Sequence, residues 1–346
     1  MRRWIAGVAT VVAVVVGAAP AWACGGLVAP NGTVNLVRTT TFAGYHDGVE
    51  HYVTSFEFAG GGGEFGSIVP LPGIPSDVVR GGDWTLQRLV EEVSPPVTFD
   101  AERAGGVALA ANAEVILEKR IDALDITILK GGAAEVGQWA LDNGFALPPD
   151  APDVLEFYAS RSPIFMAARF DATAAEELGQ KIGDGTPIHL SIPTPDPWVP
   201  LRILSLGRRG FETIEADVFL LTDAEPNLLP QAGATMTLER SEPASQSLIG
   251  DLRSDKGMGW IPESGMWLSY LKIDAAARDL DHDLAIDPSG LDTPSRVAAG
   301  LVLPREVAGL VEGAPLWAWL VGLAFVVLVL AAVDRLVGAP RGPARS

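Results

Sequence analysis

Cysteine and basic residues are both scarce in this sequence. Cys24 is the single cysteine among 346 residues, which excludes a disulfide bond within the chain and any zinc or iron–sulfur site built from several thiolates. Lysine and arginine number 25 against 43 acidic residues, for a formal charge of −18. This deficit excludes non-specific nucleic-acid binding, and an anionic lipid surface would repel most of the chain.

Charged residues make up only 20% of the chain and hydrophobic residues 48%, with a mean hydropathy of +0.25. These values exclude a disordered or collagen-like chain and indicate membrane segments. The apolar residues are concentrated at the two ends.

The first 23 residues have the three parts of a secretory signal peptide. Arg2 and Arg3 precede an apolar run that is too short to span a bilayer, and Ala21-Trp22-Ala23 forms a small-residue cleavage site. Cleavage after Ala23 would make Cys24 the first residue of the mature protein. Cys24 is thus a candidate for lipidation, but Ala21-Trp22 matches a lipoprotein signal poorly, and we expect a plain exported N-terminus.

Residues 315–334 are predicted to form a transmembrane helix. The uncharged stretch 316–333 would be about 27 Å long as a helix, close to the thickness of the hydrocarbon core. Trp317 and Trp319 are expected at the outer membrane interface and Arg335 on the inner side, where positive charge places residues 335–346 in the cytoplasm. The alternative, a buried core helix, fits less well because the stretch is apolar on all sides. The prediction is a single-pass protein of the cell membrane with its N-terminal domain outside.

The region between these segments is strongly acidic. The signal peptide carries two arginines, and the residues after 315 carry three arginines and one aspartate, so residues 24–315 have a formal charge of −22. Cations or a basic partner are therefore plausible counterparts. We expect an exported domain over 24–290, with the proline-rich 193–197 as the candidate boundary inside it, and a stalk over 291–314.

Short strands and helices alternate irregularly in the exported domain. Alternating residues on both sides of His46-Asp47-Gly48 predict a β-hairpin over 39–58, and Asp83 is the expected N-cap of a helix over 84–93. Further helices are expected over 133–141, 152–159 and 172–182. Further strands are expected over 114–121, 124–129, 164–170, 188–192, 201–206, 212–221, 235–239 and 266–273. The absence of a βαβ rhythm predicts an α+β fold with mixed or antiparallel sheets and short packed helices.

Four sequence blocks resemble one bacterial family. They are Cys24-Gly25-Gly26, the stretch 65–72, the stretch 139–148 that contains Asn143-Gly144, and Pro200-Leu201-Arg202. Together they are similar to the family catalogued as domain of unknown function 2330, in order from Cys24 to about Trp267. The resemblance implies an exported, often membrane-anchored protein and assigns no catalytic residue.

No catalytic motif is complete. Gly61 to Gly66 fits G-x-G-x-x-G, but prolines 70, 72 and 75 prevent the helix that would hold a pyrophosphate. Ser269 and Lys272 fit S-x-x-K, but their segment alternates like a strand and no K-T-G follows. The catalytic residues are therefore unknown, and no cofactor is expected apart from a candidate Ca²⁺.

Two groups of residues are candidate metal ligands. Asp279, Asp281 and Asp283 could bind Ca²⁺, although the EF-hand pattern fails and a solvated acidic loop is the alternative. His46 and His51 flank the predicted hairpin turn without an identifiable third ligand, so a surface position is expected for both. A structural role is expected for His189, which lies in an apolar strand.

These observations favour a membrane-anchored extracytoplasmic protein that binds or organises a protein or envelope partner without catalysis. Two alternatives are an envelope hydrolase that uses paired carboxylates and an accessory subunit of a membrane complex. Two buried carboxylates converging in one cleft would favour the hydrolase.

Overall fold

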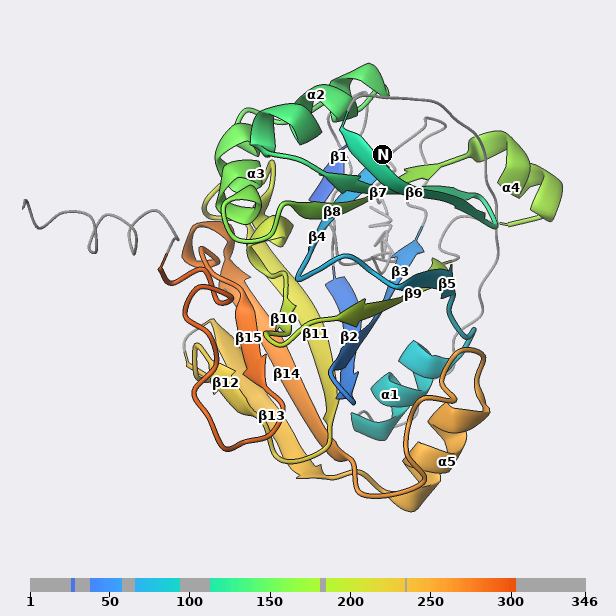
Figure 1. Cartoon of the computed structure of the whole chain (residues 1–346), viewed down its shortest axis with the longest axis vertical. Helices are drawn as coiled ribbons and strands as arrows, with labels where there is room; N and C mark the ends of the chain where they lie inside the picture. The colour runs from blue at the N-terminus through green and yellow to red at the C-terminus, as the bar shows by residue number, and fades with distance from the viewer. Residues whose placement is uncertain are drawn as a thin grey trace, which may run out of the picture.

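The computed structural model describes residues 26–28, 38–57, 66–93, 113–180, 185–233 and 235–302 (Figure 1). The predicted signal peptide, Cys24, Trp317, Trp319, Arg335, the membrane helix and the cytoplasmic tail lie outside these residues. Within them, no helix is both long and apolar enough to cross a bilayer.

The largest sheet has seven strands in the order β13-β14-β11-β2-β3-β9-β5. Its strands are β2 (Arg38–His46), β3 (Val49–Glu57), β5 (Asp77–Arg80), β9 (Gly185–Pro193), β11 (Thr213–Thr222), β13 (Met236–Pro243) and β14 (Trp267–Ala276). All neighbours are antiparallel except β2 and β11, which are parallel. The predicted hairpin is confirmed, since β2 and β3 turn at Asp47 and Gly48, both of which have positive φ.

Two smaller antiparallel sheets complete the β structure. The five-stranded sheet has the order β1-β4-β8-β7-β6 and the three-stranded sheet the order β10-β15-β12. Their strands are β1 (Gly26–Val28), β4 (Gly66–Leu71), β6 (Glu114–Ile121), β7 (Leu124–Lys130), β8 (Ile164–Phe170), β10 (Trp198–Val199), β12 (Asn227–Leu229) and β15 (Leu284–Asp287).

The helices lie at opposite ends of the view in Figure 1. Helices α2 (Ala133–Asp142) and α3 (Ala151–Ala159) lie by the five-stranded sheet, and α1 (Thr85–Val93) and α5 (Gln246–Ser254) lie by the seven-stranded sheet. Helix α4 (Ala172–Leu178) and two short 3₁₀ helices, η1 (Arg202–Ser205) and η2 (Ala277–Asp279), complete the described elements. Short helices and mostly antiparallel sheets confirm the predicted α+β class.

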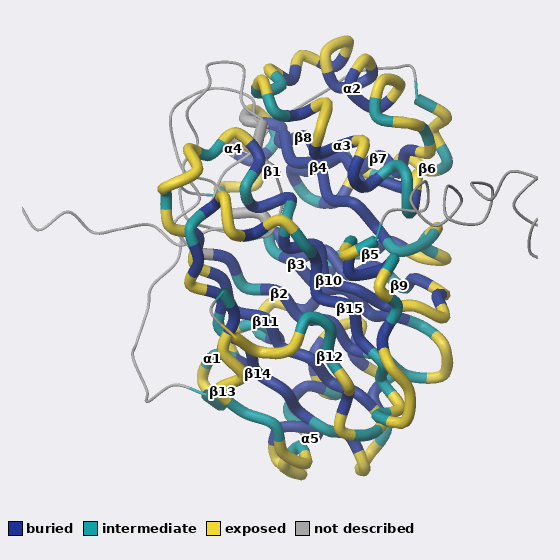
Figure 2. Tube along the Cα trace, turned by 90° about the vertical axis from the view of Figure 1, so that its left-hand side faces the viewer, coloured by how far each residue is buried: buried dark blue, intermediate teal, exposed yellow. Residues whose placement is uncertain are grey.

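Each face of the seven-stranded sheet contributes to a different hydrophobic core. On β3, Tyr52 belongs to the larger core with the five-stranded sheet, α2 and α3, whereas Val53 belongs to the core with α1 and α5. This alternation follows from the two-residue period of a strand. Figure 2 shows that buried residues dominate the central strands, while exposed residues gather on helices and loops.

Two local predictions are wrong. Residues 201–206 contain the 3₁₀ helix η1 instead of a strand. The backbone N–H groups of Leu201 and Arg202 donate hydrogen bonds to Asp283 Oδ1, at 2.8 and 3.0 Å, and are therefore not available to a neighbouring strand. Asp83 does not cap α1. Its carboxylate accepts from Arg80, and Asp255 accepts from the first turn of the helix instead.

Strands from the two sides of the predicted internal boundary pair with each other. Residues 193–197 connect β9 to β10, and β2, which precedes this segment, pairs with β11, which follows it. The first part of the predicted stalk, 291–302, is described and packs on the domain: Ala299 is fully buried and its carbonyl accepts from the Asp283 N–H at 3.0 Å. The rest of that segment, 303–314, lies outside the described residues.

Candidate functional site

Two of the four histidines of the chain meet on one face of the seven-stranded sheet. His51 on β3 is paired with Ser191 on β9, and His189 lies two residues before Ser191, so all three side chains share a face. The His51 Nδ1 and His189 Nε2 atoms are 3.0 Å apart, although the two residues are 138 positions apart in sequence. Strand pairing therefore builds this contact.

Trp260 covers the histidine pair. Its ring is parallel to that of His51, with an interplanar angle of 1° and 3.9 Å between centroids. Gly44 makes room for this ring, because a Cβ atom there would lie 2.2 Å from Trp260 Cη2. Gly257, with φ of +85°, passes over His189, where a Cβ would lie 3.1 Å from Nδ1. Two glycines thus let the 255–260 loop lie directly on the pair.

Burial keeps both imidazoles neutral at pH 7. It lowers the pKa of His51 to about 3, helped by the positive charges that His189 and His46 would carry. It also lowers the pKa of His189 to about 4, with a small opposing effect from the Asp77 carboxylate. One ring therefore donates an N–H to the bare nitrogen of the other.

The proton position in His189 is not fixed by a second partner. Its Nδ1 atom is buried and makes no hydrogen bond to the residues that the structure describes. A structural histidine normally donates or accepts at both nitrogens when it is buried. His189 thus departs from the expected satisfied structural role, and His51 departs from the expected surface position because it is only 8% exposed.

The other two histidines are apart from this pair. His46 Nδ1 lies 2.7 Å from Asp223 Oδ1 at the surface end of the hairpin, and His282 Nδ1 lies 2.9 Å from Asp281 Oδ1. The structure therefore joins His51 with His189 and not with His46.

The predicted calcium ligands do not point to a common centre. Asp283 is fully buried, and its Oδ1 accepts from Tyr158 and from the Leu201 and Arg202 N–H groups while Oδ2 accepts from Arg161. Asp279 and Asp281 are exposed and lie against Arg278 and His282. Across the described ranges, no cluster of three or more His, Cys, Asp or Glu side chains has the arrangement of a metal site.

Glu50 is a buried acid on the opposite face of β3 from His51. It is 1% exposed, its Oε2 accepts from the Trp198 N–H at 3.3 Å, and its Oε1 has no hydrogen-bond partner among the described residues. Burial raises the pKa of Glu50 to about 8, with a smaller opposing effect from the Trp198 N–H. The carboxyl group is therefore mostly protonated at neutral pH.

The two catalytic motifs considered from sequence have no matching geometry. Ser269 and Lys272 lie on β14, where a spacing of three places them on opposite faces. Most of the G-x-G-x-x-G segment is outside the described residues, and the strand β4 begins at its last glycine where a dinucleotide site would need a helix.

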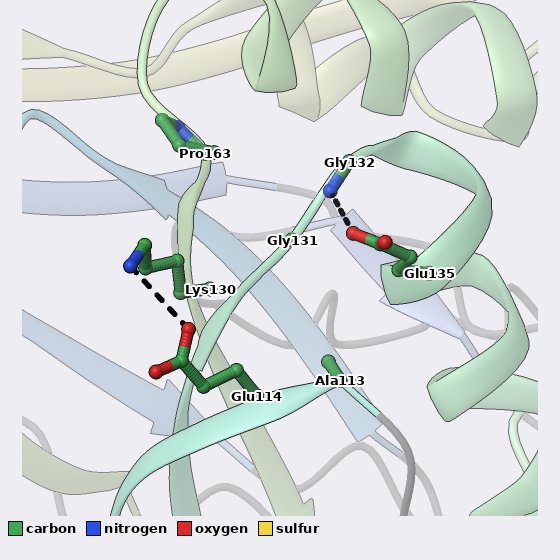
Figure 3. Close-up of a pocket in the computed structure, with 7 residues that line it drawn as sticks. All are labelled: Ala113, Glu114, Lys130, Gly131, Gly132, Glu135 and Pro163. Carbon is green, nitrogen blue, oxygen red and sulfur yellow. Dashed lines mark hydrogen bonds and ion pairs between the residues drawn. The ribbon is translucent and has the colours of Figure 1, made fainter.

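A shallow hollow of about 340 Å³ lies at the N-terminus of α2 (Figure 3). Its charged side chains are already engaged: Lys130 Nζ lies 3.3 Å from Glu114 Oε2, and Glu135 Oε2 accepts the Gly132 N–H at 2.7 Å. The Glu135 carboxylate occupies the place that an anion would take at this helix end.

Sequence reasoning did not bring His189, Ser191 and Trp260 together with His51. The alternation around His51 and His189 indicated two strands, but nothing local indicated that these strands are neighbours. One sequence feature does indicate the position of Trp260. The preceding residues, Gly257-Met258-Gly259, are typical of a loop whose backbone can approach other groups closely.

The comparisons with solved structures identified distant similarity. A mutated baculovirus P35 after caspase cleavage has a TM-score of 0.40 at 8% identity, over 72% of this chain and 99% of that chain. P35 in the caspase-8/P35 complex has a TM-score of 0.37 at 8% identity, over 72% of this chain and 95% of that chain. No curated protein matches.

The family comparison agrees with the resemblance of the four sequence blocks. The model of the family described as "Uncharacterized protein conserved in bacteria (DUF2330)" matches residues 18–224, more than half of the sequence. The chain belongs to this bacterial family.

Proposed function

We propose that this protein is a single-pass, membrane-anchored extracytoplasmic binding domain that performs no reaction of its own. Residues 1–23 direct export and residues 315–334 anchor the chain, with Trp317 and Trp319 at the outer interface and Arg335 inside. The −22 charge of residues 24–315 makes a basic protein or envelope component the natural partner.

One observation carries the preference for binding over hydrolysis: the buried carboxylates are engaged singly. Asp283 is bound by Arg161, Asp171 by Arg120, and Asp255 by the first turn of α1. A hydrolase with paired carboxylates needs two acids about 5–9.5 Å apart on one cleft, one of them with a raised pKa. Glu50 has the raised pKa, but it is enclosed, and burial alone is the source of the shift.

Protease treatment of intact spheroplasts tests the topology. Added protease should remove the ectodomain and leave the span and tail, while a variant that ends at residue 314 should be released into the soluble fraction. Full protection of the intact chain would contradict the proposal.

Crosslinking in native membranes tests the binding role. The full chain should be recovered with a basic protein or envelope component, in amounts that fall as salt is raised because the attraction is electrostatic. Recovery of the chain alone would refute a partner-based role.

A further inference from the structure

The loop between η1 and β11 presents an aromatic side chain to solvent. Phe211 is 69% exposed, and in the described part of the chain it is the one aromatic among the exposed large hydrophobic side chains. Burial of a phenyl ring is favourable, so this ring is available to an apolar partner outside the domain. An exposed hydrophobic side chain alone is not unusual, and its surroundings decide what it fits.

Two exposed arginines lie by this loop. The side chain of Arg209, on the loop itself, is 77% exposed, and that of Arg278, on η2, is 65% exposed. The Arg278 N–H donates to the Gly210 carbonyl at 3.2 Å, so η2 adjoins the loop. An acidic neighbour lies 3.7 Å from the Arg209 guanidinium and 3.5 Å from that of Arg278. Pairs of exposed charges contribute little, so both guanidinium groups can bind a phosphate instead.

An aromatic ring beside two guanidinium groups matches the chemistry of a phospholipid surface. Aromatic rings are enriched where headgroups meet acyl chains, and long basic side chains reach from there to the lipid phosphates. Most of the exported domain is acidic, with a formal charge of −22 over residues 24–315, and anionic headgroups would repel it. The loop can therefore face the bilayer while the acidic remainder is directed away.

The loop also lies near the end of the described chain. Gly207, where the loop begins, donates its N–H to the carboxylate of Asp150 directly before α3, at 3.0 Å. Gly300 lies against Phe157 toward the other end of α3, where a Cβ atom would be 2.2 Å from the ring. Since α3 has nine residues, it separates these points by no more than about 14 Å. Figure 1 shows α3 and the orange-red end of the described chain on the same side.

The predicted membrane helix would keep this part of the domain close to the bilayer. Residues 303–314 can span at most about 45 Å even when fully extended, so Val302 stays within that distance of the start of the helix at 315. Docking of a tethered domain is intramolecular, and its effective concentration is high. A contact too weak to bind a free domain to lipid is therefore sufficient here.

We propose that Phe211, Arg209 and Arg278 dock the exported domain on the phospholipid headgroups of the membrane in which residues 315–334 are anchored. The ring enters the interface, and the two guanidinium groups bind lipid phosphates. This orientation directs the opposite end of the domain, with α1 and α5, away from the membrane, where a partner can reach it (Figure 1). The docking rests on the proposed membrane anchor and names the face that the anchored domain turns to the lipid.

Quenching by spin-labelled lipids tests the docking in the full-length chain. The chain carries Cys24→Ser and one fluorophore-labelled cysteine, in vesicles of equal parts phosphatidylethanolamine and phosphatidylglycerol with the quencher on the headgroup. Thr213→Cys places the label beside the loop. Ser264→Cys places it beyond the opposite end of the β11–β14 ladder, about 30 Å away. The label at 213 should be quenched strongly and the label at 264 weakly.

Surface variants identify the groups that dock. Phe211→Ser should lower the docked-to-undocked ratio reported at position 213 by about tenfold, because it removes the ring from the interface. The variant should fold normally, since the ring is exposed. Arg209→Ser combined with Arg278→Ser should also reduce quenching and make the remainder less sensitive to salt. Leu291→Ser is the matched control, because it removes an even more exposed apolar side chain from a loop bonded to β12, and should leave quenching unchanged.

Alkaline extraction of the same vesicles separates the docking from the anchor. A chain that alkaline carbonate removes from the vesicles is not anchored, which would overturn the anchor and the docking together. A chain that stays in the vesicles but is quenched equally at positions 213 and 264 would overturn the docking alone. Equal quenching in Phe211→Ser and the parent would do the same and leave a protein as the remaining partner for the loop.

Discussion

The Glu50 carboxyl group is buried and accepts a single hydrogen bond, so a negative charge on it would be poorly stabilised in the folded state. The free energy of unfolding therefore depends strongly on whether Glu50 is ionised. The folded state holds the proton up to about pH 8, whereas an unfolded chain releases it near the ordinary value of 4.5. Between these two pH values the folded state binds more protons than the unfolded state. The free energy of unfolding must then fall as pH rises through this window.

Glu50→Gln should remove this pH dependence, because an amide of the same shape never ionises. Near pH 4.5 the variant should match the parent, and at pH 8 it should be more stable by about 2–5 kcal/mol, given about 1.4 kcal/mol per pKa unit. Chemical unfolding of the purified chain at several pH values, with a chelator present, measures this. The exposed Glu118→Gln is the matched control and should run parallel to the parent. An unchanged pH profile in Glu50→Gln would show that Glu50 ionises normally.

At the scale of the element, α1 depends on a residue that is distant in sequence. The Asp255 carboxylate accepts from the Trp84 N–H at 3.2 Å, the Thr85 N–H at 2.8 Å and the Thr85 hydroxyl at 2.6 Å. The N–H groups of a first helical turn have no partner inside the helix, and a carboxylate there also interacts favourably with the helix dipole. Asp255 thus joins the end of α5 to the start of α1.

Asp255→Ala should lower the free energy of unfolding by about 2–3 kcal/mol, because it leaves several N–H and O–H donors without their charged acceptor. Asp251→Ala removes a half-exposed carboxylate of α5 that pairs with Arg88 on α1, and should cost less than about 1 kcal/mol. Equal losses in the two variants would argue against a special role for the cap. Urea unfolding provides the comparison.

A second inter-element contact is the buried ion pair of Arg161 and Asp283. Arg161 follows α3 and also donates to the Val297 and Ala298 carbonyls, while Asp283 holds the start of η1. The guanidinium lies 4.1 Å from the centre of the Phe157 ring and 5.0 Å from that of Trp198. The Arg161–Asp283 ion pair therefore connects α3, η1 and the segment around residue 298.

Arg161→Met should destabilise the fold by about 3–5 kcal/mol, because it leaves the Asp283 carboxylate buried without its cation. The exposed pair Arg278–Asp279 is the control, and Arg278→Met should cost at most about 1 kcal/mol. Thermal unfolding followed by near-ultraviolet circular dichroism measures both. A loss in Arg161→Met no larger than in the control would mean that Asp283 is satisfied by its N–H and O–H donors alone.

Local signals account for the elements that the sequence predicts correctly. Helix α2 ends at Asn143-Gly144, where Gly144 has φ of +81°, and α3 carries proline in its first turn. Helix α5 was not predicted, since Leu248, Ile249 and Leu252 are its few buried residues and its start is marked only by Ser245, whose hydroxyl accepts from the Leu248 N–H.

At the scale of the whole molecule, the pairing of strands brings together residues whose proximity the sequence alone does not reveal. The His51–His189 contact requires β3 to pair with β9, and the parallel pairing of β2 with β11 joins segments more than 150 residues apart. Strand periodicity reveals which residues share a face, but the choice of neighbour depends on how the assembled sheet is covered on both sides. For this reason the α+β class could be predicted and the candidate site could not.

The same pairing makes a testable statement about domain division. Strands β2 and β3 lie between β11 on one side and β9 on the other, so the chain before residue 193 and the chain after residue 197 share one sheet and one hydrophobic core. Each half alone would expose buried strand edges and apolar faces, which is unstable in water. The connecting residues Pro195 and Asp196 are exposed and can accept an inserted protease site.

Cleavage at a protease site inserted at Asp196 should therefore leave the two fragments together. They should co-elute in size-exclusion chromatography and unfold in one cooperative transition, because unfolding either half exposes the core of the other. As a comparison, a protease site inserted at the exposed Ser264, between α5 and β14, shows whether cleavage in another surface loop also leaves the two fragments associated. If the Asp196-cut fragments separate, or unfold in two independent steps at different denaturant concentrations, residues 193–197 divide two autonomous units and the shared sheet does not govern stability.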